Sequence, residues 1–509
     1  MSTKYVSKTD TNGYSIGNDG NSGTSKTLPY LTLDAAITGA SAGDTIIING
    51  GTYTAATYYN VDKALTINPE PGTTVTLKRT GAVTRVMNIF STGAVTLGSI
   101  TLDAEDTASC NALSISTMAT PPKITLQSTR LLNAGSGAQA ILLPAKIKLD
   151  ASGLTISHSS NAGGIMAYGL NEGYVNIDGV SIDNSAGSGS SLQGVNITAA
   201  ATGTQCRIKG VSGTWKSSGS ANSFIRTVGV VAVIEDNINL NLTGADAGPS
   251  IIACLNSAYQ ANSCVVRYNK GTNNCSGGYG VLIGSDAPGA NDNKTNYPHV
   301  YGNEIDGTDA ASLIHGVILG NIAGGVVSGN KIRKCGIPLI SKRQTEASYF
   351  INNDIDLPVS GSGGCLRTKG SVNTQFSGNR VRSSAGYANT FVSVTKDPTI
   401  PTYSANVAVI GNSFYSSAAV SAAVGVGDGT DTSTASLQYN NYVAASFGGS
   451  AFVDHANTYG SVSAWETVEA TAMASADMTT SDKRFWNNSY RLMFESAVAA
   501  SYPHLLAII

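Results

Sequence analysis

Five basic residues recur at similar intervals in the second half of the chain, close to short apolar runs. If those runs lie on one face of successive turns of a repetitive fold, the basic side chains form a stripe along that face. Guanidinium and ammonium groups bind carboxylate and phosphate, so the stripe is a candidate surface for an acidic polysaccharide. A solvated charged face without a ligand is an equally open alternative. The stripe consists of Lys342, Arg343, Arg367, Lys369 and Lys396, with Glu346 as the only acidic residue expected nearby.

Carboxylates that could cleave a glycan are harder to identify. Hydrolysis needs a pair of carboxyl groups about 5–9.5 Å apart. The acids Glu304, Asp306, Asp354 and Asp356 recur with basic residues at matching positions, which would lower their pKa, the wrong direction for an acid catalyst. Several of the other acids lie in turn-rich segments, where capping a turn explains them at least as well. These other acids are Asp286, Asp292, Asp309, Glu346, Asp397, Asp428 and Asp431, and no catalytic pair is predicted among them.

Histidine and cysteine spacing gives no metal site. The five His form no metal-binding pattern, and His315, beside an apolar run, is the one that we add to the candidate glycan surface. Seven Cys without a CxxC pair indicate neither a disulfide framework nor a zinc site. We expect buried free thiols, no metal and no cofactor.

One repeated phrase reveals the elements that must position these side chains. An Asn, usually preceded by Gly, is followed two residues later by Ile, Val or Phe. The Asn residues are separated by 27, 23, 26 and 33 residues, at Asn303, Asn330, Asn353, Asn379 and Asn412. Self-similarity at this period, built on short β-type runs, predicts a solenoid of stacked coils, a parallel β-helix.

The residues beside the repeated Asn strengthen this prediction. Alternate side chains of a strand share a face, so the apolar column from Ile305 to Phe414 should point inward and its neighbours outward. Both outward columns alternate in charge, one through Glu304, Lys331, Asp354 and Arg380, the other through Asp306, Arg333, Asp356 and Arg382. Opposite charges on paired strands stabilise by roughly 0.2–1 kcal/mol per pair, so the alternation indicates direct pairing of successive coils.

Three segments are predicted. Residues 1–44 form an N-terminal cap, with a short helix over 32–40 that Thr32 caps. Residues 45–460 form the parallel β-helix, whose further strands include Val281-Leu282-Ile283 and Leu366-Arg367-Thr368. Residues 461–509 form a distinct C-terminal element, containing Trp465 and Trp486, that is a cap, an oligomerisation patch or an attachment point.

Composition narrows the class of protein. Charged residues make up 13% of the 509 residues, against about 25% in average domains, and Gly accounts for 57. The net charge of −2 gives no general attraction to nucleic acid. No apolar stretch reaches 18 residues, so membrane insertion is not expected. The N-terminus lacks the apolar core of a secretion signal, so synthesis in a cytoplasm and release by another route, such as lysis, is expected.

The opening of the chain resembles a known superfamily. Tyr5-Val6-Ser7, the Gly17–Gly23 turn, Pro29-Tyr30, Gly43-Asp44-Thr45-Ile46 and Gly51-Thr52-Tyr53 resemble the start of right-handed parallel β-helix proteins of the pectate-lyase-like superfamily. The resemblance implies an all-β fold, a three-faced right-handed coil with a ladder of Asn side chains. It implies little about activity, because one fold hosts many functions.

The enzymes of this superfamily have motifs that the chain lacks. Polygalacturonases carry two acidic motifs that are missing here, and Arg207-Ile208-Lys209 precedes Ile314-His315-Gly316 instead of following it. Calcium-dependent pectate lyases need a carboxylate cluster with a catalytic Arg, but Arg226 and Arg267 have no acidic neighbours at useful spacing. Neither activity is predicted.

The layout as a whole resembles bacteriophage tailspike and tail-fibre proteins. That resemblance implies a virion component, an elongated homotrimer that contacts other virion proteins and recognises bacterial surface polysaccharide. Two alternatives stay open: a polysaccharide depolymerase, hydrolase or lyase, on the same scaffold, and a purely structural virion spacer.

Overall fold

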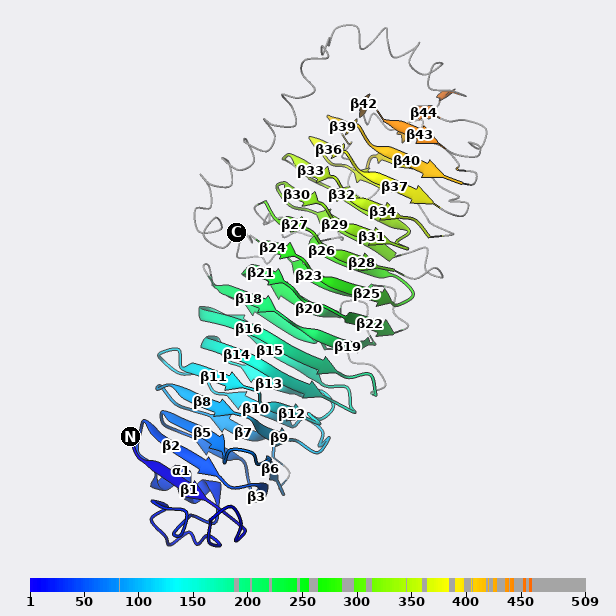
Figure 1. Ribbon diagram of the computed structural model, residues 1–509. Coiled ribbons are helices and arrows are strands. Elements are labelled where there is room, and N and C mark those ends of the chain that lie inside the picture. The colour runs from blue at the N-terminus through cyan, green and yellow to red at the C-terminus, as the bar shows by residue number, and fades with distance from the viewer. Residues whose placement is uncertain are drawn as a thin grey trace.

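The computed structural model describes residues 1–459 except 82, 187–191, 202–203, 219–221, 245–247, 256–263, 286–296, 308–313, 345, 359–363, 384–389, 398–403, 405, 418–419, 421–423, 428–434, 439, 444–451 and 455–456. Over these residues the chain winds into an elongated stack of coils, with the N-terminus at one end (Figure 1). The predicted element 461–509 and its two Trp lie outside the described residues.

Each coil contributes strands to three faces. Two faces belong to one 29-stranded sheet and the third face is a 16-stranded sheet. The strands of the first face are β1 (Thr3–Val6), β2 (Asp44–Ile48), β5 (Leu65–Pro69), β8 (Val95–Gly98), β11 (Lys123–Gln127), β18 (Gln205–Lys209), β21 (Val231–Glu235), β24 (Cys264–Arg267), β27 (His299–Tyr301), β30 (Gly325–Ser328), β33 (Ser348–Ile351), β36 (Thr374–Ser377), β39 (Val407–Ile410) and β42 (Ala435–Gln438).

The second face follows each of these strands except β1 after a short bend. Its strands are β3 (Gly51–Ala55), β6 (Val75–Arg79), β9 (Ile100–Asp103), β12 (Arg130–Leu132), β19 (Ser212–Ser217), β22 (Leu240–Gly244), β25 (Lys270–Asn274), β28 (Glu304–Asp306), β31 (Lys331–Arg333), β34 (Asp354–Asp356), β37 (Arg380–Ser383), β40 (Ser413–Ser416) and β43 (Asn441–Val443). Two long strands, β14 (Lys146–Ser157) and β16 (Glu172–Asp183), run through both faces.

The third face closes the coil. Its strands are β4 (Tyr59–Val61), β7 (Arg85–Ile89), β10 (Asn111–Ile115), β13 (Gln139–Leu143), β15 (Gly163–Leu170), β17 (Val195–Ala199), β20 (Ser223–Val228), β23 (Ser250–Leu255), β26 (Gly278–Gly284), β29 (Ile314–Gly320), β32 (Ile337–Lys342), β35 (Leu366–Lys369), β38 (Val392–Thr395), β41 (Val424–Val426), β44 (Phe452–Asp454) and β45 (Asn457–Tyr459).

Strands on each face pair in parallel with the same face of the next coil, for example β27 with β30, except that β45 pairs antiparallel with β44. Parallel strands joined by a crossover wind right-handed in nearly all proteins. The described part of the chain is therefore a right-handed parallel β-helix, as the sequence predicted.

The register confirms the charge columns. Glu304, Lys331, Asp354 and Arg380 are direct partners in successive coils, as are Asp306, Arg333, Asp356 and Arg382. Lys331 Nζ lies 3.2 Å from Glu304 Oε1, and Arg382 Nε lies 2.7 Å from Asp356 Oδ1. Flanked by Lys270 and Lys331, the carboxyl of Glu304 has a lowered pKa, as expected.

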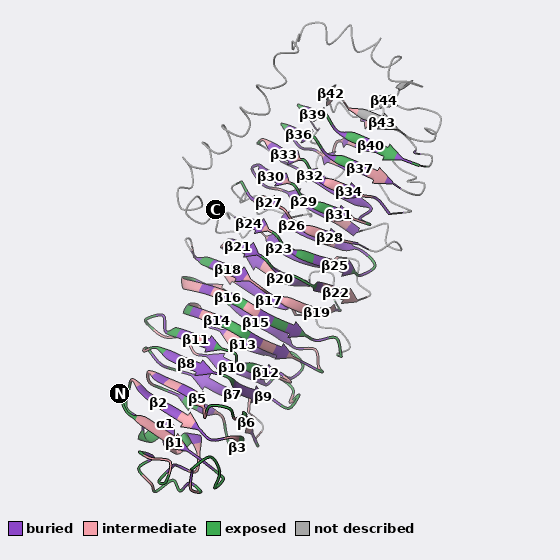
Figure 2. Cartoon of the chain, viewed as in Figure 1, coloured by how far each residue is buried: buried purple, intermediate pink, exposed green. Residues whose placement is uncertain are grey.

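Inward side chains form one apolar core that runs along the stack. Ile305, Ile332, Ile355, Val381 and Phe414 lie over one another and are almost fully buried. Buried and more accessible residues alternate along the strands, as the side-chain alternation of a strand requires (Figure 2). The seven cysteines are buried free thiols.

A ladder of buried Asn side chains lies at the bend between the first and second faces. Asn303 donates both its backbone N–H and its Nδ2–H to Asn330 Oδ1, at 3.0 and 2.9 Å, and Asn330 binds Asn353 in the same way. The ladder continues on both sides of the five predicted rungs, to Asn237 and Asn269 at one end and Asn440 at the other. Each rung satisfies buried polar groups that a tight bend leaves without strand partners.

The N-terminal residues cover the first coil. Helix α1 (Leu33–Gly39) forms where predicted, and Thr32 Oγ1 accepts a hydrogen bond from the N–H of Ala35. Its buried residues Leu33, Ala36 and Ile37 belong to the same core as the coils. Because β1 already pairs with β2, the first face begins inside the segment 1–44, and the boundary at residue 44 stays a prediction.

Candidate functional site

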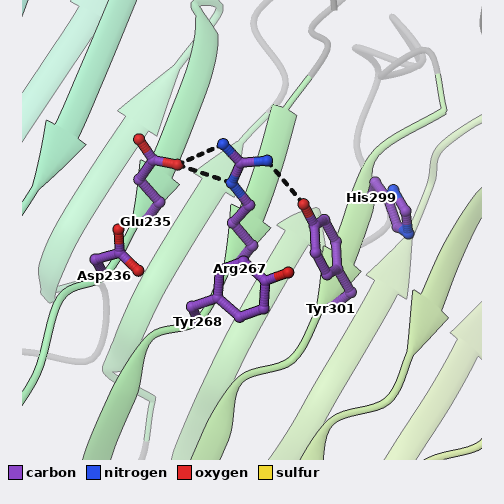
Figure 3. A pocket seen from close by; sticks show the side chains of 6 residues that line it. All are labelled: Glu235, Asp236, Arg267, Tyr268, His299 and Tyr301. Atoms are coloured by element: carbon purple, nitrogen blue, oxygen red, sulfur yellow. Dashed lines mark hydrogen bonds and ion pairs between the residues drawn. The ribbon is translucent and has the colours of Figure 1, made fainter. Parts of the chain in front are cut away.

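A shallow hollow of about 490 Å³ lies on the outer surface of the first face. Three successive strands, β21, β24 and β27, and the bends that follow the first two supply its lining (Figure 3). The lining residues are Glu235, Asp236, Arg267, Tyr268, His299 and Tyr301, which we call the first-face hollow.

Strand register explains why these residues meet. Glu235 pairs with Arg267, and Arg267 pairs with Tyr301, so their outward side chains form one column. His299 lies two residues before Tyr301 on the same outward side of β27. Asp236 and Tyr268 follow the column residues at the bend, immediately before the ladder residues Asn237 and Asn269.

Tyr268 has an unusual backbone conformation. From Asn237 to Asn412, the residue before each ladder Asn adopts positive φ, and in four consecutive rungs beyond residue 300 this position is Gly302, Gly329, Asn352 and Gly378. Tyr268 occupies it with φ of 56°, although left-handed backbone disfavours a bulky side chain. Strain of this kind, which costs on the order of 1–3 kcal/mol, is concentrated at functional sites.

The position above Tyr268 leaves room for its ring. A Cβ at Gly302 would lie 2.7 Å from two carbons of that ring, so any larger residue would displace it. The ring thus lies against the backbone of the next coil while the residue remains 53% exposed.

The aromatic groups of the hollow form a connected row. The rings of Tyr268 and Tyr301 meet edge to face with centroids 5.2 Å apart, and His299 lies 4.4 Å from Tyr301. Such rings offer apolar faces with polar edges, a combination suited to ligands that are apolar on one side and polar on the other.

Glu235 binds the guanidinium group of Arg267 in the hollow. Its carboxylate accepts from Arg267 Nε at 2.7 Å and from Arg207 Nε at 2.8 Å, although Glu235 is only 4% exposed. Burial raises the pKa of Glu235, but the two guanidinium groups outweigh burial and hold it below its usual value. Arg267 also donates to the Tyr301 hydroxyl at 2.8 Å. The guanidinium therefore orients an aromatic ring and has its charge largely offset.

His299 and Tyr301 are neutral near pH 7. Burial, reinforced by the nearby Arg267, lowers the pKa of His299 to about 4. Burial raises the pKa of Tyr301 although Arg267 opposes the rise. The hollow thus combines a neutral imidazole, which can accept a proton, with a phenol that keeps one. Within the described ranges, no group of three or more His, Cys, Asp or Glu side chains is placed to hold a metal ion. Among the same residues, no helix is long and apolar enough to cross a bilayer.

The predicted basic stripe is formed in part. Lys342 and Lys369 are direct partners on β32 and β35, and Lys396 follows Thr395, the partner of Lys369. These three ammonium groups lie along the edge where the third face ends, and all are partly exposed. Their role in glycan binding stays a prediction.

Arg343 does not belong to that surface. It follows β32 with φ of 56°, is only 8% exposed, and its Nε lies 2.7 Å from Asp397 Oδ2. The expectation that Glu346 is the only acid near the stripe is therefore wrong, since Asp397 is a buried partner. The reason is the left-handed bend, which turns the side chain inward where an unpaired charge would be costly.

The other predicted site residues lie elsewhere. Arg367 lies in the middle of β35 on the outer side of the third face, between Ile340 and Ser393. His315 lies on β29 with its ring centroid 5.2 Å from that of Tyr279. The exposed Glu346 precedes β33 and accepts from the Tyr297 hydroxyl. The acids Asp286, Asp292, Asp309, Asp428 and Asp431 lie outside the described residues.

Sequence reasoning missed the hollow, although a signal was present. Arg267-Tyr268-Asn269 has the form of Tyr301-Gly302-Asn303 with an aromatic residue in the glycine position. The prediction that Arg267 lacks an acidic neighbour is wrong, because Glu235 reaches it from the coil below, 32 residues earlier. Among the histidines, His299 lines the hollow and His315 does not.

Comparison with known proteins finds only distant similarity. No protein-family model and no curated protein sequence matches the chain. Solved structures do: a mannuronic acid specific polysaccharide family 6 lyase from human gut microbiota has 12% identity and a TM-score of 0.32, with 79% of this chain and 78% of that one covered. The A-module of an Azotobacter vinelandii mannuronan C-5 epimerase has 12% identity, coverage of 84% and 90%, and a TM-score of 0.28. A pectate lyase has 13% identity, coverage of 76% and 78%, and a TM-score of 0.23.

The chain has the right-handed parallel β-helix fold that its resemblance to the pectate-lyase-like superfamily implied, and this rests on the three-faced coil itself. Similarity at these TM-scores carries no argument about activity.

Proposed function

We propose that this protein is a tailspike- or tail-fibre-type virion component whose first-face hollow binds bacterial surface polysaccharide. The observation that supports it most is Tyr268, a strained and exposed aromatic residue with a glycine above it that accommodates the ring. A sugar ring has an apolar face and a polar rim, and the hollow matches this with Tyr268 and Tyr301 beside His299, Asp236 and Arg267. Virion attachment and a trimeric state rest on the resemblance of the overall layout.

Binding of the purified protein to capsule and lipopolysaccharide fractions tests the proposal. Tyr268→Ala should weaken binding about tenfold, which corresponds to about 1.4 kcal/mol. Tyr415→Ala is the matched control, because Tyr415 is equally exposed, at 51%, on β40 and outside the hollow. Equal affinity of the two variants would remove the hollow from the proposal. Failure of the unchanged protein to bind any fraction would favour the structural spacer.

The partly exposed basic residues are a second contact surface in this proposal. Charge reversal by Arg367→Glu together with Lys369→Glu should weaken binding to acidic glycans and leave neutral glycans unaffected. Unchanged binding across a glycan array would exclude this surface.

Depolymerase activity is the second candidate function, and one contact favours it. The neutral imidazole of His299 lies against Tyr301, whose hydroxyl accepts a hydrogen bond from Arg267, so a weak general base adjoins the same hollow. Sizing polysaccharide after incubation tests it: shorter products that disappear with His299→Gln would identify an enzyme. Sedimentation at micromolar concentration tests the trimer.

A further inference from the structure

A second polar cluster lies on the third face, away from the first-face hollow. On the side of these strands away from the apolar core, one column runs through Met166, Asn196, Arg226 and Ala253 on β15, β17, β20 and β23, and all of these except Arg226 are almost fully buried. Tyr168, two residues after Met166, is 50% exposed and interacts electrostatically with Arg226. None of these residues takes part in the proposed function.

Arg226 is a partly buried cation without a carboxylate partner among the described residues. Its Nη1 donates to Asn196 Oδ1 at 3.4 Å, and its buried Nε has no hydrogen-bond acceptor. Burial lowers the pKa of Arg226, and among the residues that the structure describes Tyr168 opposes this. A desolvated charge held by one amide and one phenol is costly, because neither group neutralises it.

Three other partly or fully buried arginines have carboxylate partners, whereas the buried Arg79 donates its Nε–H to Cys110 Sγ at 3.1 Å. Arg267 lies 2.6 Å from Glu235, Arg343 lies 2.7 Å from Asp397, and Arg382 lies 2.7 Å from Asp356. The sequence around Arg226 contains few carboxylates that could pair with it. The segments 187–191, 202–203, 219–221 and 256–263 contain no Asp or Glu, and the nearest acid before β23 is Asp246.

We propose that Tyr168, Asn196 and Arg226 form an anion-binding site. It takes a single anionic group, a carboxylate, sulfate or phosphate, attached to a ring that lies on Tyr168. The anion neutralises Arg226 and accepts its N–H groups, which are stronger donors to charged than to neutral acceptors. The half-exposed phenol supplies an apolar surface for the attached ring.

Saturation-transfer NMR with small aromatic probes tests the site directly. The probes are benzoate, benzenesulfonate, phenyl phosphate and the neutral benzamide. Benzoate should give a signal at least fivefold above benzamide, and Arg226→Gln should reduce it to the benzamide level. Arg226→Lys, which keeps the charge, should retain part of it. The ranking of the three anions identifies which acid the site prefers.

Two controls keep the outcome decisive. Arg130→Gln removes an exposed arginine from β12 and should leave the benzoate signal unchanged. Asp246→Asn tests whether Asp246 already forms an ion pair with Arg226. If it does, the substitution should raise the benzoate signal. That result would mean that Arg226 is neutralised within the chain, and the proposal would fail. An equal benzoate signal in the unchanged protein and Arg226→Gln, or no signal with any anion, also overturns it.

Thermal unfolding gives an independent readout if a variant is poorly behaved. Sodium benzoate should raise the Tm of the unchanged protein above that in sodium chloride of equal ionic strength, because ligand binding to the folded state stabilises it. The difference should vanish in Arg226→Lys or Arg226→Gln, whichever folds. A benzoate effect that persists in the variant contradicts the proposal.

Discussion

The ring of Tyr268 packs against the α-carbon of Gly302 in the next coil, where a Cβ would come within 2.7 Å of two ring carbons. Tyr268 itself has positive φ, as does Gly302 at 65°. The two residues depend on each other: Tyr268 has a strained backbone, and its ring fits only because Gly302 has no side chain.

Gly302→Ala should therefore impair glycan binding. The substitution costs roughly 1–2 kcal/mol of stability because φ is positive, and it also displaces the ring of Tyr268. Gly329→Ala is the matched control: φ there is 61°, and a Cβ would meet no atom within 4 Å. Thermal unfolding should show a loss in both variants, the larger one in Gly302→Ala, whereas glycan affinity should fall only in Gly302→Ala. A similar affinity in the two variants would show that the ring position does not matter.

The Asn ladder should dominate the stability of the coils around it. Asn330 is fully buried, donates to Asn353 Oδ1 and Val300 O, and accepts two hydrogen bonds from Asn303. Asn330→Ala leaves several of these groups unsatisfied, at about 1–3 kcal/mol for each buried group. We expect a loss of 3 kcal/mol or more in urea unfolding.

Asn274→Ala is the control for the ladder. Asn274 is exposed and its Nδ2 donates to Asn241 Oδ1 at 2.7 Å on the surface. That substitution should cost a few tenths of a kcal/mol. Comparable losses at the two positions would mean that the ladder is not a main source of stability.

Acid should weaken the first face through Glu235. Because its pKa is lowered in the folded state, its contribution is present above the unfolded value of about 4.3 and is lost as pH falls through the folded pKa. Glu235→Gln should cost about 3 kcal/mol at pH 7, since it leaves Arg267 without its buried partner. The difference in Tm between the variant and the unchanged protein should shrink below pH 4.3.

Glu172→Gln is the control for this pH dependence. Glu172 forms an exposed pair with Lys146, and exposed pairs contribute little. Its Tm should follow that of the unchanged protein at every pH. A constant difference between Glu235→Gln and the unchanged protein down to pH 2 would contradict the assigned role of Glu235.

The alternating charge column should tolerate loss of a charge better than its reversal. Glu304 lies between Lys270 and Lys331, at 3.0 and 3.2 Å. Glu304→Lys places three like charges in succession and should cost about 1 kcal/mol, against roughly half of that for Glu304→Gln. Raising the salt concentration from 0.1 to about 1 M should bring the two variants together in Tm, because exposed charges are screened. A gap that does not depend on salt would indicate a packing effect instead.

The Asn ladder, the inward column of Ile305, Ile332 and Ile355, and the charge columns could be predicted because they repeat. Residues that recur at one place in every coil become partners once the coils stack. Their regular spacing in the sequence is therefore enough to predict these contacts. Helix α1 was predictable for a similar reason, since Thr32 and the apolar residues after it lie within one turn of each other.

The tertiary structure alone decided the hollow and the anion-binding cluster. Coils vary in length, with 32 residues between Glu235 and Arg267 and 34 between Arg267 and Tyr301, so spacing does not identify which outward residues meet. The direction of a side chain at a bend also depends on one backbone angle. At Arg343 a positive φ turned a predicted surface cation inward to Asp397, and at Tyr268 it projected an aromatic ring onto the surface. The sequence thus determined the coil and its repeating contacts, because these depend on the pattern of residue types. The irregular contacts that carry the proposed chemistry depend on loop lengths and bend geometry, which only the folded chain sets.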